Sequence, residues 1–262
     1  MRVKIVDAFT DRAFAGNPAA VCFLDGADWP DAGWMQRVAA ELNMPMTAFA
    51  LPQGGDWGLR WFTPLIEERL CGHATLATAF LLGGDRTLRF HTQAGVLSAT
   101  VAADGTVTLD FPRAEVAARG AIDGLADALG AAPAEVHGTG ELRDVLAVFE
   151  DEAAVRGLAP RMDALAELCR REDIRGVVAT APGAEHDFVS RFFSPADGLP
   201  EDPVTGSSHC ALAPFWAQRL GAPRLVGHQV SARGGVVRTE LAGDRVLLSG
   251  HAVIVLDGEW RA

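Results

Sequence analysis

Residues 47–80 read TAFALPQGGDWGLRWFTPLIEERLCGHATLATAF, and residues 178–215 read VATAPGAEHDFVSRFFSPADGLPEDPVTGSSHCALAPF. When the two stretches are aligned, Arg60-Trp61-Phe62-Thr63-Pro64 meets Arg191-Phe192-Phe193-Ser194-Pro195, and Gly72 meets Gly206. The offset is about half of the chain, so the sequence predicts a duplicated domain rather than a solenoid of short repeats. We expect the polar, glycine-containing turn of each half to lie in an equivalent place, so that a site built between the halves draws one turn from each.

The composition is that of a globular protein, with 49% hydrophobic and 22% charged residues. A chain of 262 residues suits two domains of ordinary size. The net charge of −11 argues against nucleic acid and against an anionic membrane as partners, because both bind basic surfaces.

The N-terminal segment carries no export signal, because Asp7, Asp11 and Arg12 interrupt the region where a signal peptide is apolar. The longest near-apolar run, 74–84, is too short to span a bilayer. Four cysteines lie far apart, which fits a reducing compartment better than a disulfide framework. These features predict a cytoplasmic protein.

The apolar periodicity predicts an α+β chain in which each half is a curved, mostly antiparallel sheet with a helix packed inside or against it. We place the domain boundary between residues 117 and 118, giving domains at 1–117 and 118–262. Helices are expected at 31–42, 73–82, 122–129, 161–171 and 207–220. Strands are expected at 3–9, 19–24, 47–52, 57–62, 87–91, 95–102, 106–111, 144–149, 176–181, 187–193, 228–241 and 244–256.

Two turns could carry chemistry, Leu70-Cys71-Gly72-His73-Ala74-Thr75 and the segment 201–210. Glycine and small residues before an apolar helix leave backbone N–H groups unpaired at its positive end, which suits a carboxylate or phosphate. His73 and Asp202 stand one in each turn, and each could act as an acid or a base on a molecule between them. The anion-binding residues would be Gly72, Ala74, Thr75, Thr205, Gly206, Ser207 and Ser208.

Structural readings compete with these. Either turn could be a plain helix cap, His73 a hydrogen-bonded structural histidine, and Asp202 a turn residue. Arg60 and Arg191 could clamp a carboxylate, although arginine beside Trp or Phe more often stacks. Zinc ligation is conceivable but lacks the usual finger spacing, so no metal is expected; its ligands would be Cys71, His73, His209 and Cys210. Neither a dinucleotide-binding nor a phosphate-binding glycine motif is present, so no nucleotide cofactor is expected.

The residues that carry a family resemblance run through nearly the whole chain. They are Val6-Asp7-Ala8-Phe9, Gly16-Asn17-Pro18-Ala19, Phe62-Thr63-Pro64, CGHAT at 71–75, EDPVTGS at 201–207 and Ser231-Ala232-Arg233-Gly234-Gly235. In these motifs the chain resembles the phenazine-biosynthesis PhzF-like family. The resemblance implies the diaminopimelate-epimerase fold, two similar barrel-like domains around central helices with the active site between them. It also implies a cytoplasmic, cofactor-independent isomerase that moves a proton between carbons of a small carboxylate-bearing substrate, usually as a homodimer.

By the same resemblance, His73 matches the histidine of CGHAT, Asp202 the aspartate of EDP, and Gly206 and Ser207 the TGS turn. One position departs from the family pattern. The family runs Asn-Leu-Ser-Glu-Thr after the first helix, and its glutamate is the main proton-moving base. Here Met46 stands in its place, and a thioether cannot accept a proton from carbon.

Three readings of this departure remain open. The chain could be an isomerase or epimerase in which Asp202 or His73 is the base, with Cys71 as a second base if the helix start lowers its thiol pKa. It could be a catalytically silent relative that still binds a small carboxylate. It could also be an enzyme of another type. We favour the first reading and take the second as its alternative.

Overall fold

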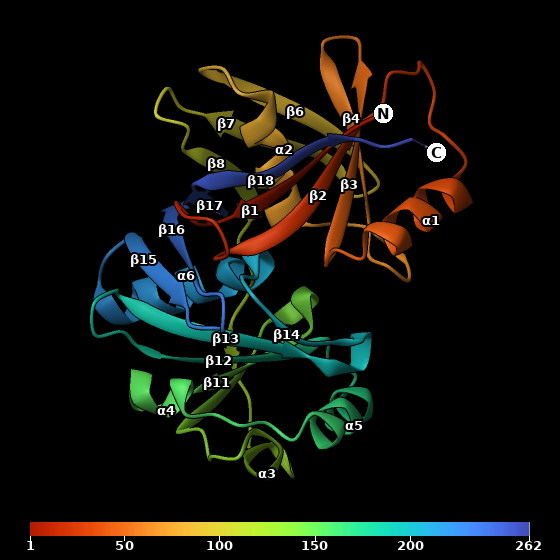
Figure 1. The fold of residues 1–262 in the computed structure, drawn as a ribbon. Coiled ribbons are helices and arrows are strands. Elements are labelled where there is room, and N and C mark those ends of the chain that lie inside the picture. The colour runs from red at the N-terminus through yellow and green to blue at the C-terminus, as the bar shows by residue number, and fades with distance from the viewer. Residues whose placement is uncertain (262) are drawn as a thin grey trace. The chain divides into compact units, whose positions relative to one another are not determined.

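The computed structural model describes residues 1–261, and the chain forms two compact units (Figure 1). The first unit comprises Met1–Phe111 and the residues from Leu248 onward, and the second comprises Pro112–Leu247. Helices and strands occur in both, which confirms the α+β class. The division differs from the predicted boundary at 117 and 118, because the C-terminal strand β18 (Ala252–Glu259) pairs with β1 (Arg2–Ala8) and so belongs to the first unit.

The first unit is a mainly antiparallel arrangement of strands with two helices. Strand β1 pairs antiparallel with β2 and β18, and β2 pairs parallel with β3. Strand β3 pairs antiparallel with β4, and β4 pairs antiparallel with β5 and parallel with β6. The antiparallel pairs β6–β7 and β7–β8 complete it. The elements not yet bounded are β2 (Asn17–Phe23), α1 (Ala32–Leu42), β3 (Met46–Gln53), β4 (Asp56–Phe62), β5 (Glu67–Glu68), α2 (Gly72–Leu82), β6 (Arg86–Thr92), β7 (Gly95–Val101) and β8 (Val107–Pro112).

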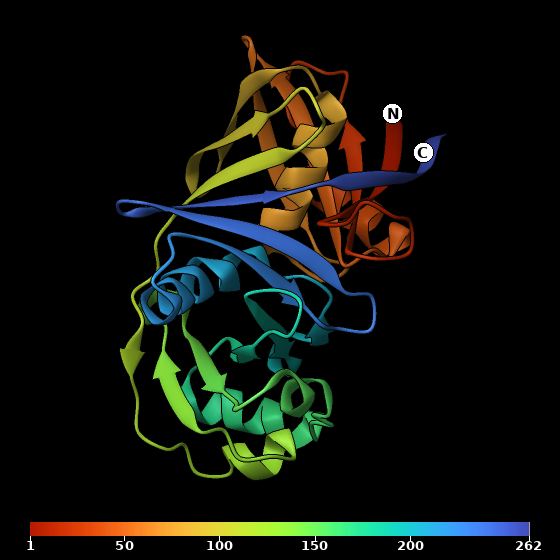
Figure 2. The ribbon, with the colours of Figure 1, turned by 90° about the vertical axis from the view of Figure 1, so that its left-hand side faces the viewer.

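The two helices of the first unit pack in different ways. Helix α1 covers one face of the strands, where Met35 and Val38 pack against Phe49 and Leu51. Helix α2 is buried at every position from His73 to Ala79 and contacts β1, β2, β3 and β7. Figure 2 shows it in gold between the yellow strands and the red strands of this unit. An all-round apolar helix of this kind is an interior helix.

The second unit repeats the same order of strand pairings. The parallel pair β11–β12 is followed by the antiparallel pair β12–β13, and β13 pairs antiparallel with β14 and parallel with β15. The pairs β9–β10, β10–β11 and β15–β16 are antiparallel. The elements are β9 (Ala117–Ala118), α3 (Leu125–Leu129), β10 (Glu135–Gly138), η1 (Gly140–Leu142), β11 (Asp144–Val148), α4 (Glu152–Arg156), α5 (Met162–Glu172), β12 (Gly176–Pro182), β13 (Phe188–Ser194), η2 (Pro195–Asp197), β14 (Leu199–Asp202), α6 (Gly206–Leu220), β15 (Arg224–Gln229), β16 (Gly235–Ala242) and β17 (Arg245–Gly250).

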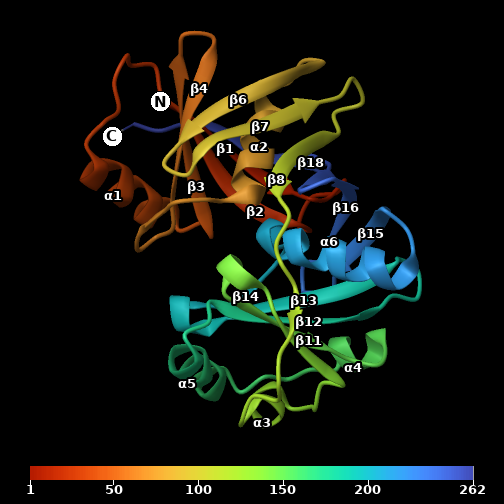
Figure 3. The ribbon, with the colours of Figure 1, turned by 180° about the vertical axis from the view of Figure 1, so that it is seen from behind.

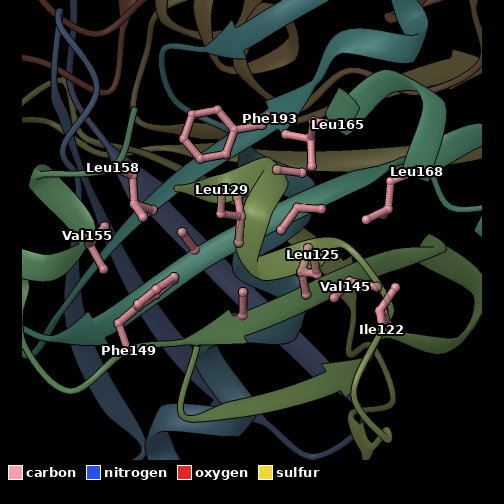
Figure 4. Packing of buried hydrophobic residues seen from close by; sticks show 14 of the residues in the cluster. Ile122, Leu125, Leu129, Val145, Phe149, Val155, Leu158, Leu165, Leu168 and Phe193 are labelled. Carbon is pink, nitrogen blue, oxygen red and sulfur yellow. The ribbon is translucent and has the colours of Figure 1, made fainter. Parts of the chain in front are cut away.

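Both faces of the sheet β11–β12–β13 are buried, so alternate residues enter different clusters. Val177, Val189 and Phe193 pack with α3, α4 and α5, as Figure 4 shows for the labelled side chains. Val178 and Phe192 pack with α6 on the other face. Figure 3 shows the same layering, with α6 on one side of these strands and the three shorter helices on the other. Burial of one such large side chain contributes roughly 1.5–3 kcal/mol.

Most predicted elements of regular periodicity are confirmed, including the helices now seen as α1, α2, α5 and α6. The two long strands predicted at 228–241 and 244–256 are wrong, because four shorter strands occupy this region. Gly234, with φ +65°, is the last residue of the turn that separates β15, which ends at Gln229, from β16. The helix predicted at 122–129 begins only after Gly124, which is also in the left-handed region. The short helix α4 was not predicted.

No helix within residues 1–261 is long and apolar enough to cross a membrane.

Candidate functional site

The CGHAT turn forms the start of α2. Cys71 is the N-cap residue in an extended conformation (φ −143°, ψ 115°), and its side chain makes no capping hydrogen bond. The first-turn N–H groups of α2 therefore lack a side-chain cap. Thr75 instead turns back, and its Oγ1 donates to the Cys71 carbonyl oxygen at 2.5 Å. The turn retains the positive end of the helix dipole, as the sequence predicted.

His73 is held by neutral groups on the first turn of α2. Its Nδ1 lies 3.3 Å from Asn17 Nδ2 and 3.5 Å from Cys71 Sγ. An amide nitrogen only donates, so Nδ1 accepts and the proton of the neutral ring sits on Nε2. Burial lowers the pKa of His73 to about 4. The imidazole is therefore neutral at pH 7, and it can donate a hydrogen bond from Nε2.

Asn17 reaches His73 because of the turn that precedes it. Gly16 has φ +66°, and a Cβ there would lie 2.2 Å from the Ala8 carbonyl oxygen. Only glycine fits such a close approach of two backbone segments. The Gly16-Asn17-Pro18 motif thus places a buried amide at the first residue of β2.

Met46 is the first residue of β3 and is 8% exposed. Phe49 and Leu51 of the same strand pack against α1. Because side chains alternate along a strand, Met46 belongs to the opposite face, together with Ala48. The position where the resemblance implies a glutamate is thus a buried thioether on the face away from α1.

Asp202 ends β14 and lies beside the start of α6. Thr205 is the N-cap of α6 and makes no side-chain cap to the helix; its Oγ1 instead donates to Asp202 Oδ2 at 2.5 Å. Gln229 at the end of β15 donates from Nε2 to the Asp202 carbonyl oxygen at 2.7 Å. Both Asp202 and Gln229 are buried, at 7% and 1% exposure. Within its own unit, the Asp202 carboxylate is therefore held by a short bond from Thr205, and the Asp202 backbone is held by Gln229.

A charged group supports the neighbouring Ser207. Arg175 Nη1 donates to Ser207 Oγ at 2.9 Å, and its other nitrogens bind both oxygens of Asp144, at 2.8 and 2.5 Å. The Asp144 side chain is fully buried and that of Arg175 is 34% exposed. Burial raises the pKa of the Asp144 carboxyl, which the hydrogen bonds and charge of Arg175 oppose. Since arginine only donates, Ser207 accepts this bond and retains its own proton for another acceptor.

Other predicted residues of the α6 start are buried. Gly206 and Ser208 lie within the first turn, and Ser208 Oγ has no hydrogen-bond partner within residues 1–261. His209 Nδ1 donates to the Thr205 carbonyl oxygen at 2.8 Å, and burial lowers its pKa to about 4. Burial raises the pKa of the Cys210 thiol to about 12, so that thiol stays protonated.

Two alternative uses of the predicted residues were metal ligation and the clamping of a substrate carboxylate by arginine. No group of three or more His, Cys, Asp or Glu side chains within residues 1–261 is arranged to hold a metal ion. Arg60 binds both oxygens of Glu67, at 2.6 and 2.7 Å, and Arg191 binds both of Glu201, at 2.8 and 2.9 Å. Both arginines also stack on aromatic rings. They brace β4 and β13 and are not available to clamp a substrate.

Three residues of the arrangement were not predicted: Arg175, Asp144 and Gln229. A charged residue at the start of the apolar run DVLAV was a signal for Asp144. Arg175 comes three residues after the end of α5, as Pro45 comes three residues after the end of α1. Aligning the two similar stretches of sequence could therefore have drawn attention to Arg175. No sequence signal marks Gln229, whose partners lie 24 and 27 residues away.

Comparison with solved structures places the chain among proteins with the fold of proline racemases. A probable proline racemase from Agrobacterium radiobacter superposes with a TM-score of 0.69 at 13% identity, over 99% of this chain and 92% of that one. The match to a protein family is more specific than this likeness of fold. The chain belongs to the PhzC-PhzF family, described as phenazine biosynthesis-like protein, whose pattern matches residues 6–258.

Two relatives illustrate the family. A protein of Pseudomonas aeruginosa named an uncharacterized isomerase is 46% identical, over 98% of this chain and 97% of that one. The crystal structure of a PhzF-family phenazine biosynthesis protein from Enterococcus faecalis has a TM-score of 0.93 and 40% identity, over 100% of this chain and 99% of that one. The resemblance inferred from the motifs is thereby confirmed.

Proposed function

We propose that the protein is a cofactor-independent isomerase or epimerase that moves a proton on a small carboxylate-bearing substrate. The observation that carries this proposal is Asp202, a buried carboxylate fixed by Thr205 at the start of α6. A fixed carboxylate beside a helix N-terminus can take a proton from carbon while the helix stabilises the negative charge that results. Family membership and the isomerase name of a relative support the reaction class.

The proposed step balances without an oxidant. Asp202 takes a proton from a substrate carbon next to a carboxylate or another conjugated group, and the electron pair of that C–H bond moves into the conjugated system. The proton then returns to the same carbon or to another one. His73, neutral with its proton on Nε2, donates a hydrogen bond to the enolate-like oxygen.

The anion of the substrate is assigned in this proposal to the turns at 72–75 and 205–208. Ser207, whose oxygen accepts from Arg175, offers its hydroxyl proton beside the N–H groups of α6. Cys71 is a weaker candidate for a base, because the neutral His73 beside it supplies no charge to stabilise a thiolate.

We also propose that the two halves of the chain arose by duplication. The matching order of strand pairings supports this. A cytoplasmic location and a homodimer remain proposals that rest on the family resemblance.

Deuterium uptake tests the proposed function. The protein is incubated in heavy water with small amino, hydroxy and unsaturated carboxylic acids, including a dihydro-hydroxyanthranilate, and each is followed by mass. We expect uptake at carbon in one class and a loss of roughly 10²–10⁴-fold in Asp202→Asn. Asp151→Asn is the matched control, because Asp151 caps α4 and asparagine caps equally well.

The alternative function is a diverged protein that binds a small carboxylate without turnover, and the buried thioether of Met46 favours it. No deuterium uptake, together with a rise in melting temperature caused by one member of the same panel, would establish it. Undiminished uptake in Asp202→Asn would remove Asp202 from the mechanism.

A further inference from the structure

The side-chain amide of Gln229 is oriented without ambiguity by its partners. Its Oε1 accepts from the backbone N–H of Thr205 at 2.8 Å, and its Nε2 donates to the Asp202 carbonyl oxygen at 2.7 Å. The opposite orientation would place oxygen against oxygen and N–H against N–H. The second proton of Nε2 faces Thr205 Oγ1 at 3.2 Å.

This orientation determines what the Thr205 hydroxyl can do. Its oxygen accepts from Gln229, and its single proton is donated to Asp202 Oδ2 at 2.5 Å. Such a chain of donors is cooperative, because each bond polarises the next. All three side chains are at least nine-tenths buried, at 1%, 6% and 7% exposure for Gln229, Thr205 and Asp202.

We propose that Gln229 is a positioning residue which, through Thr205, directs the proton accepted by Asp202 to Oδ1. Protonation at Oδ2 would turn the acceptor of the short Thr205 bond into a hydroxyl oxygen, which accepts more weakly, whereas protonation at Oδ1 leaves Oδ2 a carbonyl oxygen that keeps this bond. Of the two Asp202 oxygens, Oδ1 is therefore the one whose protonation preserves the chain from Gln229 through Thr205. This inference rests on the proposed function in taking Asp202 as the proton-moving group.

Backbone support alone does not account for the Gln229 side chain. Ser231 Oγ already donates to the Pro203 carbonyl oxygen at 2.8 Å and accepts from Gly234 N at 3.1 Å, so the segment between Asp202 and α6 has a second anchor. The bond from Nε2 to the Thr205 hydroxyl adds nothing to that anchoring. What it fixes is the direction of one proton.

The other charged and titratable groups near Asp202 in the second unit each have a hydrogen-bond partner. His209, whose pKa is about 4, changes its charge in the range where carboxyl groups titrate, so its titration is followed together with that of Asp202. Arg175 acts on Asp202 through its charge and stays protonated throughout. Asp144 is bound by Arg175, Asp197 accepts from Ser194, and Glu201 is bound by Arg191. His209, on α6, directs Nδ1 to the Thr205 carbonyl oxygen.

The test measures the protonation of Asp202 directly and in turnover. The side-chain carboxyl ¹³C resonance of Asp202, assigned by its loss in Asp202→Asn, is titrated without substrate, and the acid limb of deuterium uptake is measured for the same variants. Thr205→Val should raise both midpoints by about one pH unit, because a hydrogen bond to the charged form is lost. Gln229→Met should shift both in the same direction by less, and Thr205→Ser should restore the wild-type values.

Thr78→Val is the matched control, because its buried hydroxyl donates only to the Ala74 carbonyl oxygen within α2. Unchanged Asp202 titration in both Thr205→Val and Gln229→Met would overturn the inference, even if the wild type takes up deuterium. Shifted titration in a protein that takes up no deuterium would uphold the link from Gln229 to Asp202 and overturn the proposed function. If Gln229→Met does not fold, Gln229→Asn serves, since it keeps a neutral amide but is one methylene shorter and cannot span both Asp202 and Thr205.

Discussion

The starts of α2 and α6 are built on the same backbone plan with opposite chemistry. At α2, His73 is held by the neutral side chains of Asn17 and Cys71. At α6, Ser207 is held by Arg175, which is itself bound to Asp144. The difference teaches that two helices can begin in a similar way while the groups around their first turns form a polar neutral set in one unit and an ionic set in the other.

The two units also differ at the first residue of the strand that follows α1 and of the strand that follows α5. Helices α1 and α5 have the same length and end at Asn43 and Asp173, both in the left-handed region. The next strands then begin at Met46 and Gly176. A Cβ at Gly176 would lie 2.6 Å from the Phe193 carbonyl oxygen, so this position accepts no side chain in the second half. In the first half it holds a methionine.

Acidification should have the largest effect, and it tests whether the two halves respond alike. Burial lowers the pKa of His73 and of His209 from 6.5 to about 4. Between these values the unfolded chain binds more protons than the folded one, so the free energy of unfolding falls as the pH falls through this window. Each histidine should account for about 3 kcal/mol of the loss.

Urea unfolding at several pH values between about 7 and 4 measures this effect. His73→Asn and His209→Asn should each remove about half of the pH dependence, whatever their effect at pH 7. An unaltered pH dependence in one variant would mean that the histidine of that half is protonated as readily when folded as when unfolded.

Met46→Glu should supply the first half with the ionisable base that it lacks. With the rest of the site intact, we expect deuterium uptake to rise by roughly 100-fold, within the usual range for a positioned base. Met46→Gln has the same shape without the base and should show no rise. A folded Met46→Glu protein that binds ligand but gains no rate would show that the first half has diverged beyond this one position.

Arg175→Met should expose the ionic character of the second half. It leaves the fully buried Asp144 carboxylate without its partner. Since Arg175 is 34% exposed, water can reach part of the pair, and we expect a loss of about 2 kcal/mol, below the range for fully buried pairs. Arg224→Met is the control, because its exposed pair with Glu240 should contribute less than about 1 kcal/mol. Equal losses in urea unfolding would contradict a special role for Asp144.

The caps of α1 and α5 offer the smallest contrast. Asp31 caps α1 by accepting from Trp34 N at 3.1 Å, whereas Arg161 at the start of α5 gives no side-chain cap. Asp31→Ala should lower stability by about 1 kcal/mol. Arg161→Ala should change it by about 0.5 kcal/mol or less. Thermal unfolding of both variants measures these changes in stability. A larger loss of stability for Arg161→Ala than for Asp31→Ala would contradict the prediction.

Local pattern was enough to predict most of the fold. Helices α1, α2, α5 and α6 carry apolar residues at regular spacing, and Gly54-Gly55 marks the hairpin of β3 and β4, with both glycines at positive φ. Prediction failed between 228 and 256, where the apolar alternation continues across Gly234 and Gly250. A Cβ at Gly250 would lie 2.6 Å from the Phe9 ring, and a contact with so distant a residue is invisible to local pattern.

The candidate site was predictable only where one turn carries it. His73 is two residues from Cys71, and Asp202 is three residues from Thr205. Arg175, just before β12, and Gln229, at the end of β15, reach the same turn from 32 and 24 residues away. Their roles depend on how β12 and β15 are placed against α6, which is a property of the folded unit.

The pairing of β18 with β1 reverses the order in which the ribosome can finish the two units. The second unit is continuous from Pro112 to Leu247, so all of its residues are translated before β18. The first unit, although its synthesis starts earlier, lacks β18 until residues 252–259 emerge. The half that is translated first is thus the half whose sheet closes last, and until then the edge of β1 that β18 will cover remains open to other partners.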